Sequence, residues 1–167
     1  ILDSSVFTFG QGVDKTANVY QTTNGLLKKF KSKRIFDTPN SEQAETALAL
    51  GASLNGGLRP VLIHHRVDFM PYSFDQLINW ISLWSFKSAK KSFAPLVIRA
   101  MVGRDWGQGP QHAKTLHTMF SYIPGLRVVM PSSASEAKGM LLSSIMSDDP
   151  VIFLEYRSLY NTKELVP

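Results

Sequence analysis

The sequence predicts an α/β protein, a three-layer α/β/α sandwich around a mostly parallel sheet of six strands. Short apolar runs alternate along the chain with longer stretches in which Ala and Leu recur at helical spacing. The apolar runs are continuous, which is typical of strands buried on both faces of a sheet. The chain has 167 residues, the length of one ordinary domain. We therefore expect residues 1–167 to fold around a single sheet with helices on both sides.

Turn residues mark the elements of the first half. The run VFTF predicts the first strand, which ends at the turn GQG at 10–12. The stretch SEQAETALALGASLNG has helical spacing, an acid in its first turn and a stop signal, NGG, at 55–57. The predicted strands of this half are 6–9, 34–37 and 60–67, and its predicted helices are 22–30 and 41–56.

The second half continues the same alternation. The residues YSFDQLINWISLWSF have strong helical spacing, and the strand-like run PLVIRAMV leads into a glycine-rich loop, GRDWGQGP, at 103–110. The predicted strands of this half are 95–102, 126–130 and 150–156, and its predicted helices are 72–86, 111–123 and 133–146.

The composition excludes several classes of protein. The absence of cysteine excludes a disulfide framework and a thiolate zinc site, and it favours a reducing compartment, for which we expect the cytoplasm. No apolar run approaches the ~20 residues of a membrane span. The net charge of +5 includes the cluster KKFKSKR at 28–34, at a predicted helix end where cations suit the dipole. We interpret this cluster as a solvated helix end and expect neither nucleic acid nor a membrane as a partner.

The four histidines do not predict a metal site. His64 and His65 are adjacent on a predicted strand, so their side chains point to opposite faces. His112 and His117 are five residues apart on a predicted helix, which is off the i, i+4 spacing of paired ligands. We therefore expect this chain to supply no metal ligands.

Three common motifs are absent from the sequence. No Gly-x-Gly-x-x-Gly follows a predicted strand, no Gly-Lys-Ser/Thr occurs, and there is no Gly-x-Ser-x-Gly. The sequence thus indicates neither a dinucleotide-binding site of the Rossmann type, nor a P-loop, nor a serine hydrolase.

The loops after the predicted strands form the candidate site, because ligands bind outside the carboxyl ends of parallel strands. The loops 10–16, 37–43, 66–72 and 103–112 should therefore converge. Glu42 lies in the first turn of a predicted helix, where an acid either stabilises the helix by ~0.3–1 kcal/mol or faces a ligand.

Two rings in these loops also allow two interpretations. Phe69 is either a core residue or a platform on which a ligand ring stacks. His112 opens a predicted helix behind the glycine-rich loop, where it either caps the helix or meets a ligand.

Read in order, the loops and strands resemble the pyrimidine-binding domain of thiamine-diphosphate enzymes in the transketolase group. The closest branch is the beta subunit of 2-oxoacid dehydrogenases of the pyruvate and branched-chain type, and the resemblance covers nearly the whole chain. It implies the thiamine-diphosphate-binding fold. The blocks that carry it are RIFDTPNSE (34–42), GGLRPVLIHHRVDFM (56–70), FDQLINW (74–80), PLVIRAMVGRDWGQGPQH (95–112), PGLRVVMPSSASEAKG (124–139) and DDPVIFLEYRSLYN (148–161).

The resemblance implies roles for four residues. The glutamate of its TP-x-SE block, here Glu42, contacts the ring nitrogen of the cofactor's aminopyrimidine and favours the imino tautomer, which removes the thiazolium proton. Phe69 packs on the aminopyrimidine, and His112 acts on substrate-derived intermediates or on the lipoyl acceptor. Asn40 replaces an aliphatic residue that walls the pyrimidine pocket. The implied catalytic residues are thus Glu42 and His112, and the implied cofactor-binding residues are Glu42, Phe69 and Asn40.

Two further positions depart from the family pattern. The family usually has an acidic pair after the first strand, whereas this chain has Gln11-Gly12, which puts an acidic proton relay in doubt. Ser147 stands where relatives often have an acid near a potassium site, so we do not predict that ion.

The resemblance also implies what lies outside this chain. The family holds the diphosphate through magnesium with a Gly-Asp-Gly motif, which is absent here. We therefore expect an alpha-type diphosphate-binding subunit or domain to hold the magnesium of thiamine diphosphate. The expected assembly is a homodimer or a heterotetramer that serves a lipoyl-bearing acyltransferase. Residues 1–167 should be a fragment of a longer chain that lacks its C-terminal domain and is inactive alone.

The leading function is therefore oxidative decarboxylation of a 2-oxoacid with acyl transfer to a lipoyl group. Two alternatives stay open. One is a transketolase-like acyl or aldehyde transferase domain, and the other is a non-catalytic interaction domain with a decayed site, suggested by Gln11 and Asn40.

Overall fold

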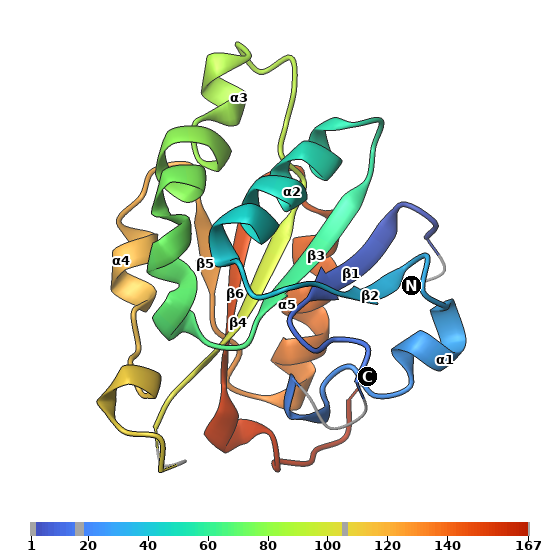
Figure 1. Cartoon of the computed structure of the whole chain (residues 1–167), viewed down its shortest axis with the longest axis vertical. Coiled ribbons are helices and arrows are strands. Elements are labelled where there is room, and N and C mark those ends of the chain that lie inside the picture. Colours follow the sequence, from blue (N-terminus) through green and yellow to red (C-terminus); the bar gives the residue numbers. More distant parts are fainter. Residues whose placement is uncertain (1–2, 16–18, 105–106, 167) are drawn as a thin grey trace.

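A six-stranded sheet forms the centre of the computed structural model, which describes residues 3–15, 19–104 and 107–166 (Figure 1). The strand order is β2-β1-β3-β4-β6-β5, and every neighbouring pair is parallel. The predicted α/β class with six strands is thus confirmed. The strands are β1 (Val6–Gly10), β2 (Ile35–Asp37), β3 (Arg59–His64), β4 (Val97–Val102), β5 (Arg127–Val129) and β6 (Val151–Tyr156).

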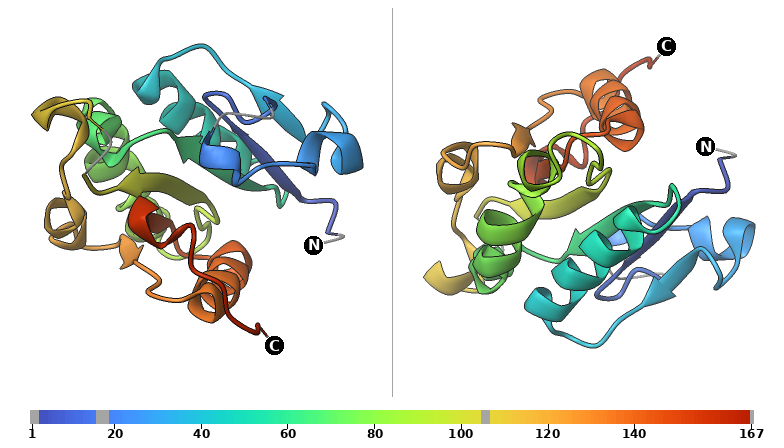
Figure 2. Two further views of the ribbon diagram at one scale, coloured as in Figure 1. Left: turned by 90° about the horizontal axis from the view of Figure 1, so that it is seen from below. Right: turned by 90° about the horizontal axis from the view of Figure 1, so that it is seen from above.

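Helices cover both faces of the sheet, as the two end-on views show (Figure 2). One face carries α2 (Glu42–Leu54), a 3-10 helix (Val67–Ser73), a π-helix (Asp75–Ile81), α3 (Trp84–Lys87) and α4 (His117–Ser121). The other carries α1 (Leu26–Phe30) and α5 (Ala134–Met146). Short 3-10 turns occupy Val19–Gln21, Pro110–His112 and Arg157–Leu159. None of the helices in these ranges combines the length and apolar character needed to cross a bilayer.

Alternating side chains along the central strands build a separate core on each face. Successive residues of a strand point to opposite faces, so strands in register contribute whole rows to each layer. Each side chain of this size that is fully buried contributes about 1.5–3 kcal/mol. The row that packs on the α2 face includes Leu62, Ile98 and Ile152, and the row that packs on the α5 face includes Val61, Val97 and Val151.

The two long helices begin one residue after the predicted starts at 41 and 133, and they have different caps. Helix α5 has a side-chain cap, because the Ser133 hydroxyl accepts a hydrogen bond from the Glu136 amide at 3.1 Å. Helix α2 begins after Ser41 without such a side-chain bond. Its first turn carries two acids, Glu42 and Glu45, which suit the positive end of the helix dipole. The carboxylates of α2 are therefore available for other contacts.

Two predicted helices are interrupted in the structure, and the predicted helix 22–30 is shortened to Leu26–Phe30. The predicted helix 72–86 is split, because the π-helix interrupts it with an i+5 bond from the Ser82 amide to the Leu77 carbonyl at 3.0 Å. The predicted helix 111–123 contains only the turn Pro110–His112 and α4, with residues 113–116 between them outside any helix.

A tertiary contact explains the second interruption. The backbone amide of Lys114 donates to Asp68 Oδ1 at 2.9 Å, so it is not free to donate along a helix. Ala113 has φ −137°, which lies outside the helical range. His112 therefore sits in a 3-10 turn and does not open a helix, which corrects the sequence prediction.

The sheet has a topological switch point between β1 and β3. These strands are neighbours, but the chain leaves β1 toward β2 at one edge and leaves β3 toward β4 on the other side. Loops diverge at such a point and leave a crevice at the carboxyl ends of the two strands. Gly10 ends β1 there with φ 137°, and a Cβ on it would lie 2.2 Å from the Ile63 carbonyl oxygen. Glycine is thus required for the two strands to approach beside the crevice.

Candidate functional site

Gln11 and Glu42 meet at the switch point. Gln11 follows β1 and is 6% exposed, while Glu42 is the first residue of α2. The Gln11 Nε2 donates to Glu42 Oε1 at 3.1 Å and to Glu45 Oε2 at 3.4 Å. One amide group therefore holds two carboxylates from the first turn of α2.

Glu45 is the centre of a buried polar chain under α2. It is 4% exposed and accepts a hydrogen bond from Thr38 Oγ1 at 2.7 Å. Its Oε2 lies 3.3 Å from Nδ1 of His64, which is 1% exposed. On the other side of the ring, His64 Nε2 lies 3.1 Å from Thr46 Oγ1, whose hydroxyl donates to Ser73 Oγ at 2.9 Å. The chain of contacts thus links α2 to β3 and to the 3-10 helix Val67–Ser73.

Glu45 and His64 were not predicted as members of the site. Glu42 and Glu45 are three residues apart, a spacing that puts both carboxylates on one side of the helix. His64 follows Leu62 by two residues, so both point to the α2 face. The three-residue spacing in the helix and the two-residue spacing in the strand were the sequence signals that could have identified Glu45 and His64.

Phe69 and His112 form a ring pair after β3 and β4. Their centroids are 5.4 Å apart with an interplanar angle of 67°, an edge-to-face contact. Arg66, which is 8% exposed, donates from Nη1 to the His112 carbonyl at 3.1 Å and from Nη2 to the Gln108 side chain. The structure thus brings two predicted site residues together, and Arg66 fixes the loop that carries one of them.

The predicted residues form two groups along the carboxyl edge. Glu42 belongs to the group after β1 and β2, and the ring pair belongs to the group after β3 and β4. The bond between Thr46 and Ser73 connects the helix of the first group to the 3-10 helix of the second. Asn40 is exposed on the turn before α2. Residues 105–106 of the glycine-rich loop lie outside the described residues.

Two titrating groups flank this edge. Burial works to raise the pKa of Asp37, but hydrogen bonds from Lys15 and the Gly12 amide outweigh burial and hold that pKa below its usual value. Burial lowers the pKa of His65, and the adjacent Arg66 cation acts in the same direction. Near neutral pH, Asp37 is therefore an anion and His65 a neutral ring. Among the described residues, no three His, Asp or Glu side chains converge as metal ligands.

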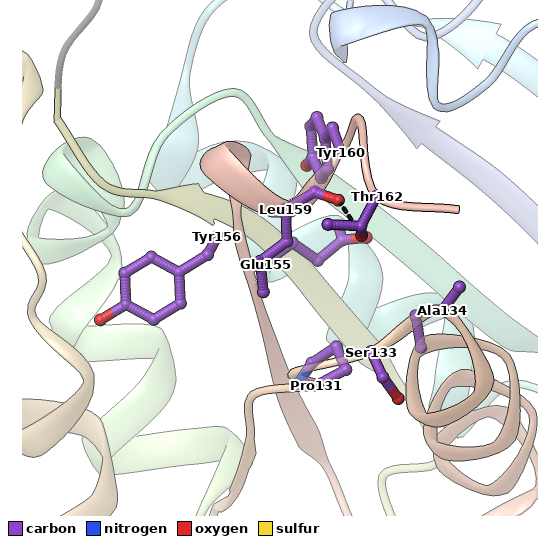
Figure 3. A pocket seen from close by; sticks show the side chains of 9 residues that line it. Pro131, Ser133, Ala134, Glu155, Tyr156, Leu159, Tyr160 and Thr162 are labelled. Atoms are coloured by element: carbon purple, nitrogen blue, oxygen red, sulfur yellow. Dashed lines mark hydrogen bonds between the residues drawn. The ribbon is translucent and has the colours of Figure 1, made fainter. Parts of the chain in front are cut away.

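A cavity of about 180 Å³ lies away from these residues, between the end of β6 and the start of α5 (Figure 3). The Thr162 hydroxyl donates to the Leu159 carbonyl at 2.6 Å along one wall. Burial raises the pKa of the Tyr160 hydroxyl, and Glu155 is held by Arg99 at 2.9 Å. None of the predicted site residues lines this cavity, so we do not place the site there.

A parallel three-layer α/β domain with a carboxylate at its switch point and an aromatic pair after the next two strands of the sheet is typical of a ligand-binding domain. Comparison with known families identifies which kind of ligand-binding domain it is. Residues 3–163 match the model of the family described as "Transketolase, pyrimidine binding domain". The chain belongs to this family, which is thiamine-diphosphate-dependent, and the resemblance predicted from the sequence is confirmed.

Curated relatives agree along the whole chain. The Rickettsia felis pyruvate dehydrogenase E1 component subunit beta is 36% identical over 167 residues, which is 100% of this chain and 51% of the relative. The Pseudomonas aeruginosa 2-oxoisovalerate dehydrogenase subunit beta is 39% identical over 159 residues, which is 95% of this chain and 45% of the relative. The Cupriavidus necator acetoin:2,6-dichlorophenolindophenol oxidoreductase subunit beta is 37% identical, over 99% of this chain and 51% of the relative. The chain therefore spans about half the length of these relatives.

A solved structure supports the fold. The protein titled "Split gene transketolase, inactive beta4 tetramer" aligns with a TM-score of 0.70 at 18% sequence identity, over 92% of this chain and 45% of that one. At this identity the likeness concerns the fold alone.

The described side chains fit an aminopyrimidine. Such a ring needs a carboxyl group at its ring nitrogen and an apolar face to pack on. Glu42 has one oxygen bound by Gln11, and no hydrogen bond to its Oε2 is found among the described residues. Phe69 is half-buried beside His112, so part of its surface remains accessible. The chemistry of these groups is thus compatible with the cofactor of the family.

Proposed function

We propose that this chain is the pyrimidine-binding domain of a beta-subunit-like thiamine-diphosphate-dependent 2-oxoacid dehydrogenase. The enzyme would decarboxylate a 2-oxoacid and pass the acyl group to a lipoyl carrier. The observation that carries the proposal is the position of Glu42, at the switch point with Oε1 bound by Gln11. Relatives named as pyruvate and 2-oxoisovalerate dehydrogenase beta subunits, at 36% and 39% identity, support the choice of reaction.

Glu42 has the central role in the proposed site. When bound, thiamine diphosphate supplies a nucleophilic carbanion at its thiazolium carbon. Glu42 Oε2 would share a proton with the ring nitrogen of the aminopyrimidine, which makes the exocyclic nitrogen basic enough to accept the thiazolium proton. Gln11 fixes the other oxygen, so the carboxyl group keeps one orientation toward the ring.

The remaining site residues would bind and orient. Phe69 would pack on the aminopyrimidine face, and its edge contact with His112 sets the distance between the ring and the histidine. His112 would donate or accept a proton on the substrate side of the site. Asn40, exposed before α2, would add a polar wall to the pyrimidine pocket.

The proposed enzyme needs a second half. The sequence has no Gly-Asp-Gly motif, so an alpha-type subunit or domain would hold the diphosphate and its magnesium. We propose residues 1–167 as one domain of a longer chain, in a heterotetramer or homodimer that serves a lipoyl-bearing acyltransferase in the cytoplasm. The isolated domain should be inactive because the cofactor would lie between the two halves.

The test uses the full-length chain assembled with its diphosphate-binding partner. Glu42→Gln should lower 2-oxoacid decarboxylation by about 100- to 10,000-fold, the range of a lost acid–base group. The matched control is Glu136→Gln, which removes the first-turn acid of the other 13-residue helix and should leave turnover near wild type. Near-normal turnover in Glu42→Gln would overturn the proposal.

Two measurements on the same preparation separate the alternatives. Ketose transfer in place of oxoacid decarboxylation would indicate the transketolase-like function. Calorimetry with thiamine diphosphate and magnesium would give no binding heat if the site were decayed.

A further inference from the structure

We propose that Gln11 and Glu45 are positioning residues that orient the Glu42 carboxylate. They belong to a buried series of side-chain contacts that ends at His64. The inference rests on the proposed function, because it concerns how Glu42 is presented to the aminopyrimidine. It goes further by assigning a role to a buried acid and histidine that the proposed chemistry does not use.

The amide of Gln11 fixes the orientation of Glu42. Its nitrogen carries two protons, and the two contacts, at 3.1 Å to Glu42 Oε1 and 3.4 Å to Glu45 Oε2, use one each. An amide donates but does not ionise, so both carboxylate oxygens must act as acceptors. Glu42 Oε1 is therefore engaged, and the second oxygen is the one left for a ligand.

Glu45 in turn fixes Gln11. A carboxylate that is 4% exposed must have partners to offset its desolvation, and Glu45 has the Thr38 hydroxyl at 2.7 Å and the His64 ring at 3.3 Å. These contacts come from the residue after β2 and from the last residue of β3. The acceptor that Gln11 meets is therefore held by two strands and by α2.

His64 lies at the end of this chain of contacts. Its Nδ1 is 3.3 Å from Glu45 Oε2 without forming a hydrogen bond, and its Nε2 is 3.1 Å from Thr46 Oγ1. The buried ring therefore packs between Glu45 and Thr46.

Two variants of the full-length chain, assembled with its partner, test the inference. Gln11→Leu removes the amide, and the double variant Glu45→Leu with His64→Leu replaces the buried pair by apolar groups of similar size. The matched control is Gln76→Leu. Gln76 is also a buried glutamine, 8% exposed on the α2 face of the sheet, and the one hydrogen bond found for its side chain among the described residues is to Asp75.

Three quantities are measured for each variant. They are the dissociation constant of thiamine diphosphate by calorimetry, the exchange rate of its thiazolium proton with D₂O, and the position of the Glu42 carboxylate in crystals without cofactor.

Gln11→Leu should slow proton exchange by about 10- to 100-fold, the equivalent of one hydrogen bond to a charged group, while changing the dissociation constant less than about threefold. Glu42 should adopt more than one position in the cofactor-free crystals. Combined with Glu42→Gln, Gln11→Leu should cause no further loss, because both changes remove the same function. The double variant should slow exchange by a smaller factor of about 3 to 10, since Gln11 keeps one of its contacts.

Exchange in Gln11→Leu equal to that in the Gln76→Leu control would overturn the inference and leave the proposed function intact. Additive losses with Glu42→Gln would also overturn it, because Gln11 would then act independently of Glu42. Normal exchange in Glu42→Gln alone would overturn the proposed function and the inference together.

Discussion

The guanidinium of Arg66 binds the carbonyl oxygen of His112 at 3.1 Å, across 46 residues of sequence. The same side chain donates to Gln108, so it holds both ends of the segment that carries the histidine. Arg66 also lies over the Tyr20 ring, with its Cζ 5.9 Å from the centroid. One buried cation therefore ties the loop after β4 to the end of β3.

Replacing Arg66 by methionine should destabilise the folded chain. The change removes the hydrogen bonds that the guanidinium donates to the His112 carbonyl and the Gln108 side chain, and each such bond contributes about 0.5–1.5 kcal/mol. Arg66→Lys should recover only part of this loss, because a single ammonium group does not match the spacing of two acceptors. Urea denaturation of the wild type and both variants measures the free energy of unfolding. Equal stability of Arg66→Lys and the wild type would contradict the two-acceptor role.

The ion pair between Arg99 and Glu155 lies on the face of the sheet that α5 covers. The side chains are 9% and 11% exposed, and Nε and Nη2 of Arg99 bind the carboxylate at 3.0 and 2.9 Å. Glu155→Gln leaves a buried cation without its counter-charge, so the free energy of unfolding should fall by about 3–5 kcal/mol.

An apolar pair at these two positions provides the control. The double variant Arg99→Met with Glu155→Leu removes both charges and should unfold at a urea concentration close to that of the wild type. A double variant as unstable as Glu155→Gln would show that the charges themselves, and not their pairing, stabilise the fold.

The central strands were predictable from the sequence because they are buried on both faces and therefore read as continuous apolar runs. Residues 61–63 and 97–102 show this, since both lie within predicted strands that the structure contains. The helices on the surface depend on contacts that local spacing does not reveal. Asp68 binds the Lys114 amide and ends helical pairing there, although the sequence around 111–123 has helical spacing.

The site was predictable in part. The position of Glu42, Phe69 and His112 in loops after strands follows from the parallel sheet, and the ring pair is found in contact. The roles of Gln11 and Glu45 depend on a hydrogen bond between residues 34 apart, which no local pattern encodes. The assignment of Glu42, Phe69, His112 and Asn40 to the cofactor remains a proposal.

Gly10→Ala should damage the site through the backbone. A Cβ at this position would lie 2.2 Å from the Ile63 carbonyl oxygen, and the φ of 137° is strained for any residue other than glycine. The end of β1 must then shift and carry Gln11 with it, so cofactor affinity and stability should both fall. Gly51→Ala is the matched control, because Gly51 lies in α2 with no atom within 4 Å of the added Cβ. That variant should be more stable by about 0.5–1 kcal/mol, and both are compared by urea denaturation and calorimetry.

The stability of the folded chain should decrease below about pH 6.5. Burial holds the pKa of His65 below the ordinary imidazole value of about 6.5. Just below that pH the unfolded chain binds more protons than the folded chain, so the free energy of unfolding falls as the pH drops. The fall ends below the folded pKa, where both states are protonated. His65→Gln should remove this decrease in a series of urea titrations, and an unchanged profile would exclude His65 as its source.

Asp37 should give a separate decrease at lower pH. Although burial opposes ionisation, the hydrogen bonds from Lys15 and Gly12 hold the pKa of Asp37 below its ordinary value of about 3.9. Its contribution is present above that value and is lost as the pH falls through the folded pKa. In the same titrations, Asp37→Asn should flatten the profile below about pH 4 and leave the decrease near pH 6.5 in place. Lys15→Met should also reduce the lower step, because it removes the first of the hydrogen bonds that stabilise the anion. A lower step that survives in both variants would mean that other carboxylates produce it.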